Sequence, residues 1–180
     1  MWQHVRAWFF RNALNKAVPR QPFRQMMHWH EVQHVGVLID IDSPSLVHAA
    51  HQAVAAMKKM GKQVRVLEWS RQKDFPQLGT ISSWRLSAKD VNWYGKPSRG
   101  VIDDFTHSPF DVLLVFVEKI ELPIRWVIAM SRASCRVGID EAATDCFDLI
   151  VQVPAEAQNT SSFFDTVKKL MSLKGEPLTA

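Results

Sequence analysis

The chain has 180 residues, 47% of them hydrophobic and 22% charged, and its formal net charge at pH 7 is +4. These values are typical of a soluble globular domain that buries its own core, and they exclude disordered and collagen-like chains. No apolar stretch approaches the roughly 18 residues that a membrane-spanning helix needs, and the longest, residues 112–117, has the length of a strand.

Positive charge is concentrated at the N-terminus. The first 30 residues carry +5 and no Asp or Glu in a chain of +4, so residues 31–180 sum to −1. This asymmetry divides the chain into a basic, aromatic N-terminal arm, residues 1–30, and an α/β domain, residues 31–180. The positive residues of the arm are Arg6, Arg11, Lys16, Arg20 and Arg24.

The arm begins with a predicted helix over residues 2–18, which Pro19 and Pro22 end. An acid-free basic helix with tryptophans can dock on the α/β domain, bind RNA, a ribosome or another protein, or lie on an anionic membrane. The sequence leaves these alternatives open, and Trp2 and Trp8 join the basic residues as candidates for partner binding. The apolar residues on one arc of this helix are Trp2, Phe9, Phe10, Ala13, Leu14 and Ala17.

The same segment lacks the pattern of a secretory signal, because Arg6 and Arg11 interrupt its apolar residues. Cys135 and Cys146 have neither metal-binding nor redox spacing. We therefore expect a cytoplasmic protein with reduced thiols.

The α/β domain begins with a strand–helix–strand unit. Residues 34–41 are apolar at nearly every position, which predicts a strand buried on both faces. Ser43 is the predicted N-cap of the next helix, Pro44 its first residue and Gly61 its C-terminal stop. A second strand over residues 62–69 completes a βαβ unit, in which the two strands are parallel.

Residues 70–110 interrupt this rhythm, because the segment is too long for a plain connection in a compact domain. Within it, residues 80–86 are compatible with a short strand and residues 101–105 with a helical turn. The alternation then resumes. The predicted elements are a buried strand at 110–118, a helix at 122–134, strands at 135–139 and 147–154, and a closing helix at 161–173.

Strands that alternate with helices predict a three-layer α/β domain with a mostly parallel, five-stranded sheet, flavodoxin-like or Rossmann-like, preceded by the basic helix. Residues 34–41 and 111–117 are expected to be neighbouring parallel strands. The expected sheet core comprises Val37, Ile39, Leu113, Val115, Leu149 and Val151.

Ligands of such sheets bind at the carboxyl ends of the strands, where the strand order reverses. Asp40 and Asp42 end the first strand and Glu118 follows the third, so all three are candidate polar contacts. Paired carboxylates can bind a divalent cation. A metal or phosphoacceptor site would also need an aspartate at the end of the third strand, where Phe116 and Val117 stand, so we favour a structural role.

The stretch at residues 92–97 has two interpretations. Asn92 can form a side-chain turn, Gly95 can adopt positive φ, and Lys96 is extended by the proline that follows. Trp93 and Tyr94 can hold the segment on the sheet as a packed lid, or form the lip of a ligand site. The candidate pocket comprises Asp40, Asp42, Ser43, Asn92, Trp93, Tyr94, Lys96 and Glu118.

No cofactor is expected. The turn after the first strand, residues 40–45, has no glycine, whereas dinucleotide and P-loop motifs need glycines that let the backbone approach phosphate. Neither a nucleophile elbow nor a zinc-ligand spacing occurs. We therefore expect no tightly bound nicotinamide, flavin, nucleoside triphosphate or metal.

Two stretches, Asn-Trp-aromatic-Gly-Lys-Pro at residues 92–97 and Ser-x-Ala…Val-Gly at residues 131–138, resemble a family of uncharacterised small bacterial α/β proteins found mainly in the Bacteroidota. The resemblance covers roughly residues 32–173. It implies an α/β fold, and because its members have no established activity, it implies no catalytic residue.

Two functions remain. The first is a non-enzymatic binding or accessory protein, attached to RNA, a ribosome or a protein partner through its arm. The second is a small-molecule transferase or hydrolase with a pocket at the strand ends under residues 92–97. The missing catalytic motifs favour the first, whereas a deep pocket lined by Asp42, Trp93 and Lys96 would favour the second.

Overall fold

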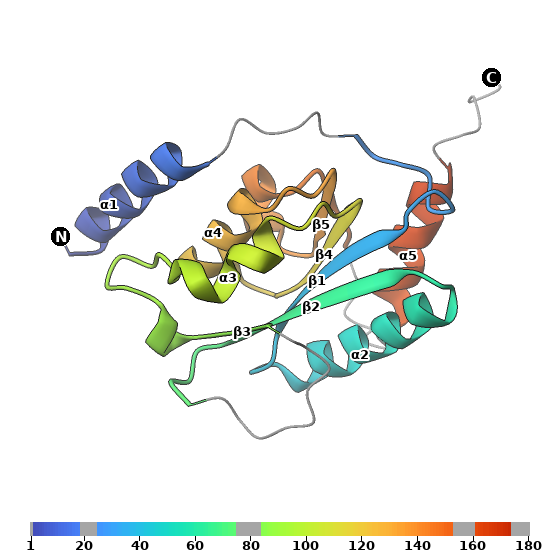
Figure 1. Ribbon diagram of the computed structural model, residues 1–180, viewed down its shortest axis with the longest axis horizontal. Coiled ribbons are helices and arrows are strands. Elements are labelled where there is room, and N and C mark those ends of the chain that lie inside the picture. Colours follow the sequence, from blue (N-terminus) through green and yellow to red (C-terminus); the bar gives the residue numbers. More distant parts are fainter. Residues whose placement is uncertain (1, 19–24, 75–83, 153–160, 174–180) are drawn as a thin grey trace.

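A six-stranded parallel sheet forms the centre of the computed structural model (Figure 1). The structure describes residues 2–18, 25–74, 84–152 and 161–173. All neighbouring strands are parallel, and their order is β3-β2-β1-β4-β5-β6. The strands are β1 (His34–Asp40), β2 (Gln63–Ser70), β3 (Trp84–Ser87), β4 (Val112–Phe116), β5 (Cys135–Gly138) and β6 (Leu149–Ile150).

The strand order reverses between β1 and β4, at the centre of the sheet. These strands pair in parallel, with Ile39 opposite Phe116, which confirms the predicted pairing of residues 34–41 and 111–117. Both strands are buried at almost every position, because helices cover both faces of the sheet. Since all strands point the same way, their carboxyl ends meet along one edge of the sheet.

The predicted count of five strands is corrected to six. The additional strand is β3, an edge strand of four residues in which Trp84 is half-buried and Leu86 is buried. The strand overlaps residues 80–86, which the sequence showed to be compatible with a short strand but which were not counted in the sheet, because so short a stretch carries little periodicity. Residues 80–83 of that stretch lie outside the described residues. The opposite edge, β6, is shorter than predicted, and its Leu149 is only half-buried. The other predicted core residues, Val37, Ile39, Leu113, Val115 and Val151, are buried.

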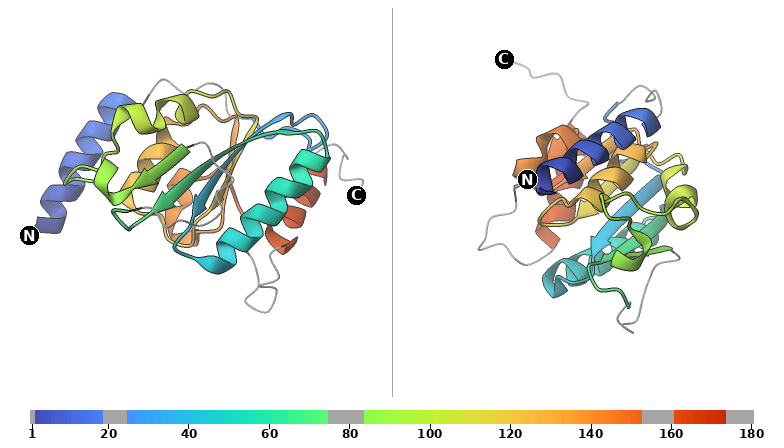
Figure 2. Two further views of the ribbon diagram at one scale, coloured as in Figure 1. Left: turned by 60° about the horizontal axis from the view of Figure 1, so that its bottom comes forward. Right: turned by 90° about the vertical axis from the view of Figure 1, so that its left-hand side faces the viewer.

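Two helices, α2 (Pro44–Lys59) and α5 (Ser161–Ser172), cover one face of the sheet (Figure 2). Ser43 is the N-cap residue of α2 as predicted, and Gly61 follows the helix with a φ of +77°, a conformation that favours glycine. Trp29 lies in the core cluster of this face and is 6% exposed. The boundary drawn at residue 30 therefore passes through a packed segment.

The other face carries α3 (Arg99–Thr106), α4 (Leu122–Met130) and two 3-10 segments, η1 (Ala88–Asp90) and η2 (Glu141–Cys146). The predicted helical turn at residues 101–105 is thus α3. The helix predicted over residues 122–134 ends at Met130, because Ser131 has an extended backbone and its hydroxyl accepts a hydrogen bond from the Ala133 amide (3.2 Å).

The predicted basic helix, α1 (Trp2–Ala17), docks on the outer side of α4 at one end of the molecule (Figures 1 and 2). Phe10 is 3% exposed, and its ring meets that of Trp126 edge-on with centroids 5.9 Å apart. Trp2 and Phe9 belong to the predicted arc but remain 79% and 41% exposed. The docked face is therefore narrower than the arc. Its partly buried residues are Ala13, Leu14 and Ala17.

Candidate functional site

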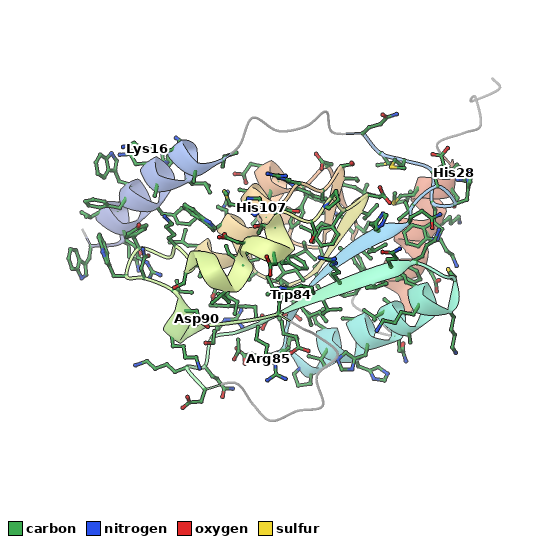
Figure 3. All side chains as sticks on the ribbon, in the orientation of Figure 1. Lys16, His28, Trp84, Arg85, Asp90 and His107 are labelled. Carbon is green, nitrogen blue, oxygen red and sulfur yellow. The ribbon has the colours of Figure 1, made fainter. Side chains whose placement is uncertain are left out.

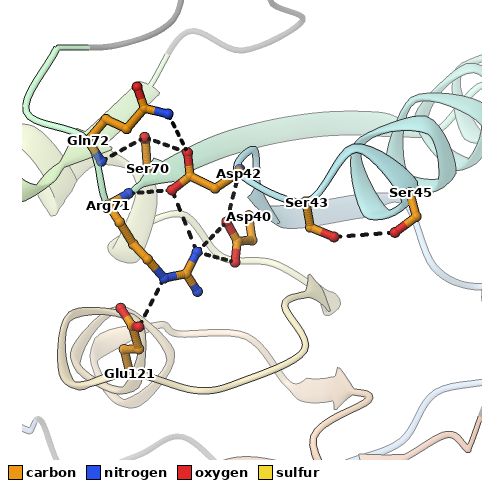
Figure 4. Close-up of polar contacts among 8 residues, drawn as sticks. All are labelled: Asp40, Asp42, Ser43, Ser45, Ser70, Arg71, Gln72 and Glu121. Atoms are coloured by element: carbon orange, nitrogen blue, oxygen red, sulfur yellow. Dashed lines mark hydrogen bonds and ion pairs between the residues drawn. The ribbon is translucent and has the colours of Figure 1, made fainter.

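A polar network occupies the carboxyl edge of the sheet, centred on Arg71, the first residue after β2 (Figure 4). Its Nη1 donates to Asp40, the last residue of β1, at 3.0 Å from Oδ1 and 2.8 Å from Oδ2. Its Nε donates to Oε1 of Glu121, the residue before α4, at 3.0 Å. One guanidinium thus joins β1, β2 and α4 at the point where the strand order reverses.

Asp42 completes the network from the turn after β1. Its carboxylate accepts hydrogen bonds from the Arg71 amide (2.6 Å), the Ser70 hydroxyl (2.9 Å) and the Gln72 side chain (3.4 Å). Its own amide donates to Asp40 Oδ1 at 3.1 Å. Both aspartates are therefore engaged with protein groups. Within the described ranges, no group of three His, Cys, Asp or Glu side chains is placed to hold a metal ion.

The environment of this network shifts two pKa values. Burial raises the pKa of the Asp40 carboxyl above its ordinary 3.8, and the hydrogen bond and charge of Arg71 offset only part of that effect. For Arg71, burial acts to lower the pKa, but hydrogen bonds and charges from Glu121 and Asp40 outweigh it and leave the pKa raised. Arg71 therefore stays positively charged, and Asp40 takes up a proton at a higher pH than an ordinary aspartate.

A cleft of about 790 Å³ opens beside the network. Its wall is formed by α1, the end of β2, the segment between β3 and α3, and the start of α4. Residues from distant parts of the chain therefore meet in one site. Among the polar lining residues are Arg6, Arg71, Asn92, Lys119 and Glu121.

The lining of the cleft carries more positive than negative charge. Glu121 is paired with Arg71, whereas Arg6 and Lys119 are exposed and have no ion pair with any residue that the structure describes. Trp69 also lines the cleft; it is 3% exposed, and its indole Nε1 has no hydrogen-bond partner among the described groups. The cleft thus presents two cations, Arg6 and Lys119, that have no counter-ion among the described residues.

The segment at residues 92–97 forms a tight turn over the start of α4. The Asn92 side chain accepts a hydrogen bond from the Lys96 amide (2.9 Å), and the Gly95 amide donates to the Asn92 carbonyl (3.0 Å). Gly95 has a φ of +98°, as the sequence predicted, and a Cβ there would lie 2.6 Å from Cβ of Leu122. The Lys96 ammonium lies over the Trp126 ring, 5.1 Å from its centroid. This turn is packed against the body.

Aromatic side chains join this turn to α1. The ring of Trp93 stacks on Trp2 with centroids 6.3 Å apart and meets Phe9 at 5.2 Å. Phe9 also meets the ring of Trp8 edge-on at 4.9 Å, and Tyr94 packs beside Trp93 at 5.3 Å. We call these five residues the α1 aromatic cluster. The arm and the turn, which the sequence treated as separate sites, therefore form one surface.

The candidate pocket residues occupy different places. Asn92 and Trp93 line the cleft, whereas Asp40 and Asp42 lie behind Arg71 in the network. The remaining four do not line the cleft. Ser43 stands at the N-cap position of α2 with its hydroxyl on that of Ser45, Tyr94 packs on Trp93, Lys96 covers Trp126, and Glu118 is exposed after β4.

Arg71, Lys119 and Glu121 were not among the candidate residues. Each follows a central strand or precedes a helix near the point where the strand order reverses. That position was the one feature of the sequence that could have identified them as site residues. Of the basic arm residues, Arg6, Arg11 and Lys16 are exposed on α1, where Figure 3 labels Lys16. Arg20 and Arg24 lie outside the described residues.

The fold defines a parallel, doubly covered α/β protein with a cleft at the carboxyl edge of its sheet. The chain belongs to a family of unknown function, DUF6913, whose model matches residues 6–173. The match includes most of α1 as well as the sheet. Comparison with curated proteins and with solved structures found no significant match. No helix in the described part of the chain is long and apolar enough to cross a membrane.

Proposed function

We propose that the protein is a non-enzymatic, cytoplasmic binding protein that attaches through α1 to the surface of an anionic membrane. The observation that carries this proposal is the concentration of exposed apolar and basic side chains around α1. Such a combination is typical of helices that lie in the interface of a membrane.

The apolar part of this surface is large. Trp2 is 79% exposed, Trp8 58% and Trp93 56%, and Phe9 and Val5 lie beside them at 41% and 36%. These are five of the eight large apolar side chains that are exposed in the described part of the chain. Apolar side chains gathered in this way mark an interaction surface.

The charged side chains of α1 are all positive. Arg11 and Lys16 are exposed on α1, Arg6 lies at its cleft side, and no Asp or Glu occurs in the helix. The cytoplasmic leaflet of a membrane is negatively charged and attracts such residues, each by about 1 kcal/mol. Tryptophan is enriched where a membrane meets water.

Among the partners that the sequence left open, the ring geometry favours the membrane over RNA. Single-stranded RNA is held by bases that stack on free aromatic faces. Here Trp2 stacks on Trp93, and Phe9 meets both Trp93 and Trp8 edge-on, so the rings pack on one another instead of standing apart. A cluster of this kind suits insertion into an apolar interface.

The alternative of a transferase or hydrolase has one observation in its favour, the cleft at the strand ends. Its proposed polar contacts, Asp40, Asp42 and Glu118, all lie outside the cleft lining, and the two aspartates are engaged by Arg71 and Ser70. A general base or nucleophile must reach the reacting atom. We therefore retain binding as the function.

We also infer a Rossmann-like fold. The order β3-β2-β1-β4-β5-β6 is that of dinucleotide-binding sheets, and the five strands without β3 have the flavodoxin order. The glycine-free turn after β1 lacks the phosphate-binding loop of such proteins. We further infer that the stretch at residues 92–97, which packs against α1 and α4, characterises the family in the Bacteroidota.

The test is flotation of the full-length protein with vesicles of phosphatidylglycerol and phosphatidylcholine. We expect binding that weakens with salt and is lost on phosphatidylcholine alone. The double variant Trp2→Ala/Trp8→Ala should lower the affinity about tenfold or more, because two large apolar side chains no longer insert. Arg11→Gln/Lys16→Gln should lower both the affinity and its salt dependence.

Matched controls lie at the far end of the molecule, where α2 ends. Met60→Ala removes an exposed apolar side chain, and Lys58→Gln/Lys59→Gln removes two exposed cations. Both should leave vesicle binding unchanged. Absence of vesicle binding, equal loss in the controls, or co-sedimentation with RNA but not with vesicles would overturn the membrane proposal.

A further inference from the structure

Beyond this attachment, we propose that the cleft is a binding site for a small organic anion. The phosphate or carboxylate group of the ligand pairs with Arg6 and Lys119, and its apolar part lies against Trp93 and Leu122. The site shares Arg6 and Trp93 with the surface proposed for the membrane, but it also contains Lys119 and takes a different class of ligand.

The position of the cleft supports a binding site. It lies at the carboxyl edge of the sheet beside Arg71, which bonds to the end of β1 and the start of α4, where the strand order reverses. Open α/β sheets bind their ligands at this place. Its volume of about 790 Å³ falls in the range of small-molecule sites, roughly 300–1,000 Å³.

The charge of the lining indicates the sign of the ligand. Three cations and one carboxylate line the cleft, and the carboxylate of Glu121 bonds to Arg71. Asp40 and Asp42, behind Arg71, supply further negative charge to that guanidinium. Arg6 and Lys119 are the lining cations that have no counter-ion among the described residues. An anionic group that enters the cleft therefore finds two free partners.

The other lining groups indicate the shape of the ligand. Leu122, Ile120 and Val91 are half-buried, and Trp93 is exposed, so the wall has an extended apolar part. Pockets for small molecules combine such a wall with a few polar groups that fix the orientation of the ligand. The amides of Gln3 and Asn92, which also line the cleft, are suited to that role.

Side chains, and not the backbone, must bind the anion. The turn after β1 has no glycine, and the Asp42 carboxylate lies in that turn, where a nucleotide phosphate approaches in dinucleotide-binding sheets. Arg and Lys bind phosphate and carboxylate groups without such a turn. The ligand is therefore a compact anion with an apolar group and not a dinucleotide.

Phenyl phosphate is the first probe, because it joins an anionic group to an apolar ring, and isothermal titration calorimetry measures its affinity. Benzoate tests the carboxylate, inorganic phosphate tests the anion alone, and benzyl alcohol tests the ring alone. We expect phenyl phosphate or benzoate to bind, inorganic phosphate to bind more weakly, and benzyl alcohol not to bind.

The decisive comparison uses two double variants with equal changes in charge. Arg6→Gln/Lys119→Gln removes the two free cations of the cleft. It should lower the affinity for phenyl phosphate or benzoate, whichever binds, by about tenfold or more. Arg11→Gln/Lys16→Gln removes two cations of α1 that do not line the cleft and should change the affinity less than about twofold. Circular dichroism of both variants confirms that α1 and the sheet remain folded.

Three results would overturn the inference. They are the absence of binding by both organic anions at millimolar concentration, equal weakening by the two double variants, and equal binding of benzyl alcohol. The first excludes the ligand class, the second indicates non-specific attraction, and the third assigns the cleft to neutral ligands. None of them bears on the vesicle test, whose variants change Arg11, Lys16, Trp2 and Trp8, residues that do not line the cleft.

Discussion

Asp40 shows how a single buried carboxyl affects stability. Because burial raises its pKa in the folded protein, the folded state holds the proton more tightly than the unfolded chain. Its contribution to the free energy of unfolding is therefore largest at low pH and declines as the pH rises above the ordinary value of 3.8. Arg71 limits this decline by stabilising the charged form.

The variant Asp40→Asn tests this sign. Its amide cannot titrate, so its free energy of unfolding relative to the wild type should rise as the pH increases from 3.8 through the raised pKa. Urea unfolding of both proteins at a series of pH values measures the difference. A difference that stays flat, or that falls with pH, would contradict the direction of the pKa shift.

Gly95 is the residue on which the turn at 92–97 depends. Its φ of +98° strains any residue with a Cβ, and that Cβ would lie 2.6 Å from Leu122. Gly95→Ala should therefore lower the free energy of unfolding by about 1–3 kcal/mol. Gly100→Ala is the matched control, because its Cβ meets no atom within 4 Å and it stands in helix α3.

The control should be neutral or raise the free energy of unfolding by up to about 1 kcal/mol, because alanine is the better helix former. Urea unfolding at one pH measures both variants. Equal stability of the two variants would show that neither the backbone conformation nor the contact with Leu122 matters.

At the scale of the element, α1 is held by a narrow contact in which Phe10 is the one fully buried residue of the helix. Phe10→Ala should release α1 from α4 while the sheet stays folded, because β1 and β4 are buried by helices on both faces independently of α1. Hydrogen exchange should then show faster exchange in α1 and unchanged protection in β1. Val5→Ala, at an exposed apolar position of the same helix, is the control.

If Phe10→Ala accelerated exchange in β1 as much as in α1, the helix would be part of one cooperative core. The same comparison measures how far the first 18 residues are a separable element. Trp29 marks the limit of this separation, because it packs in the opposite core cluster, against Phe164 of α5, with ring centroids 5.4 Å apart.

At the scale of the molecule, the central elements could be predicted and the edges could not. Residues 34–41 and 112–117 are apolar runs that only a doubly covered strand explains, so their pairing followed from the sequence. β3 is too short to show a period, and its place beside β2 depends on pairing between distant residues. The contact between α1 and Trp93 also joins residues that are distant in the chain, so the sequence did not indicate it.

The candidate site followed the same rule. Its location at the strand ends came from the topology, but the identity of its residues depended on side-chain contacts across three elements. The sequence identified Asp42 as a candidate residue, and the structure places it in the network. Arg71, which bonds to Asp40 and Asp42, could not be identified in the same way, because only its position after β2 marked it. A pattern along the chain records which face a residue occupies and not which residue it meets there.

The docked α1 has a consequence for how two binding events communicate. Its Gln3 and Arg6 belong to the wall of the cleft, while Trp2 and Trp8 belong to the surface proposed for the membrane. A ligand that binds only while α1 is docked stabilises docking. The surface proposed for the membrane joins Trp2 and Phe9 of α1 to Trp93 of the body, so it also exists only while α1 is docked. Under both proposals, linkage therefore requires that the small anion strengthens attachment to the membrane, and that the membrane strengthens binding of the anion, by the same factor.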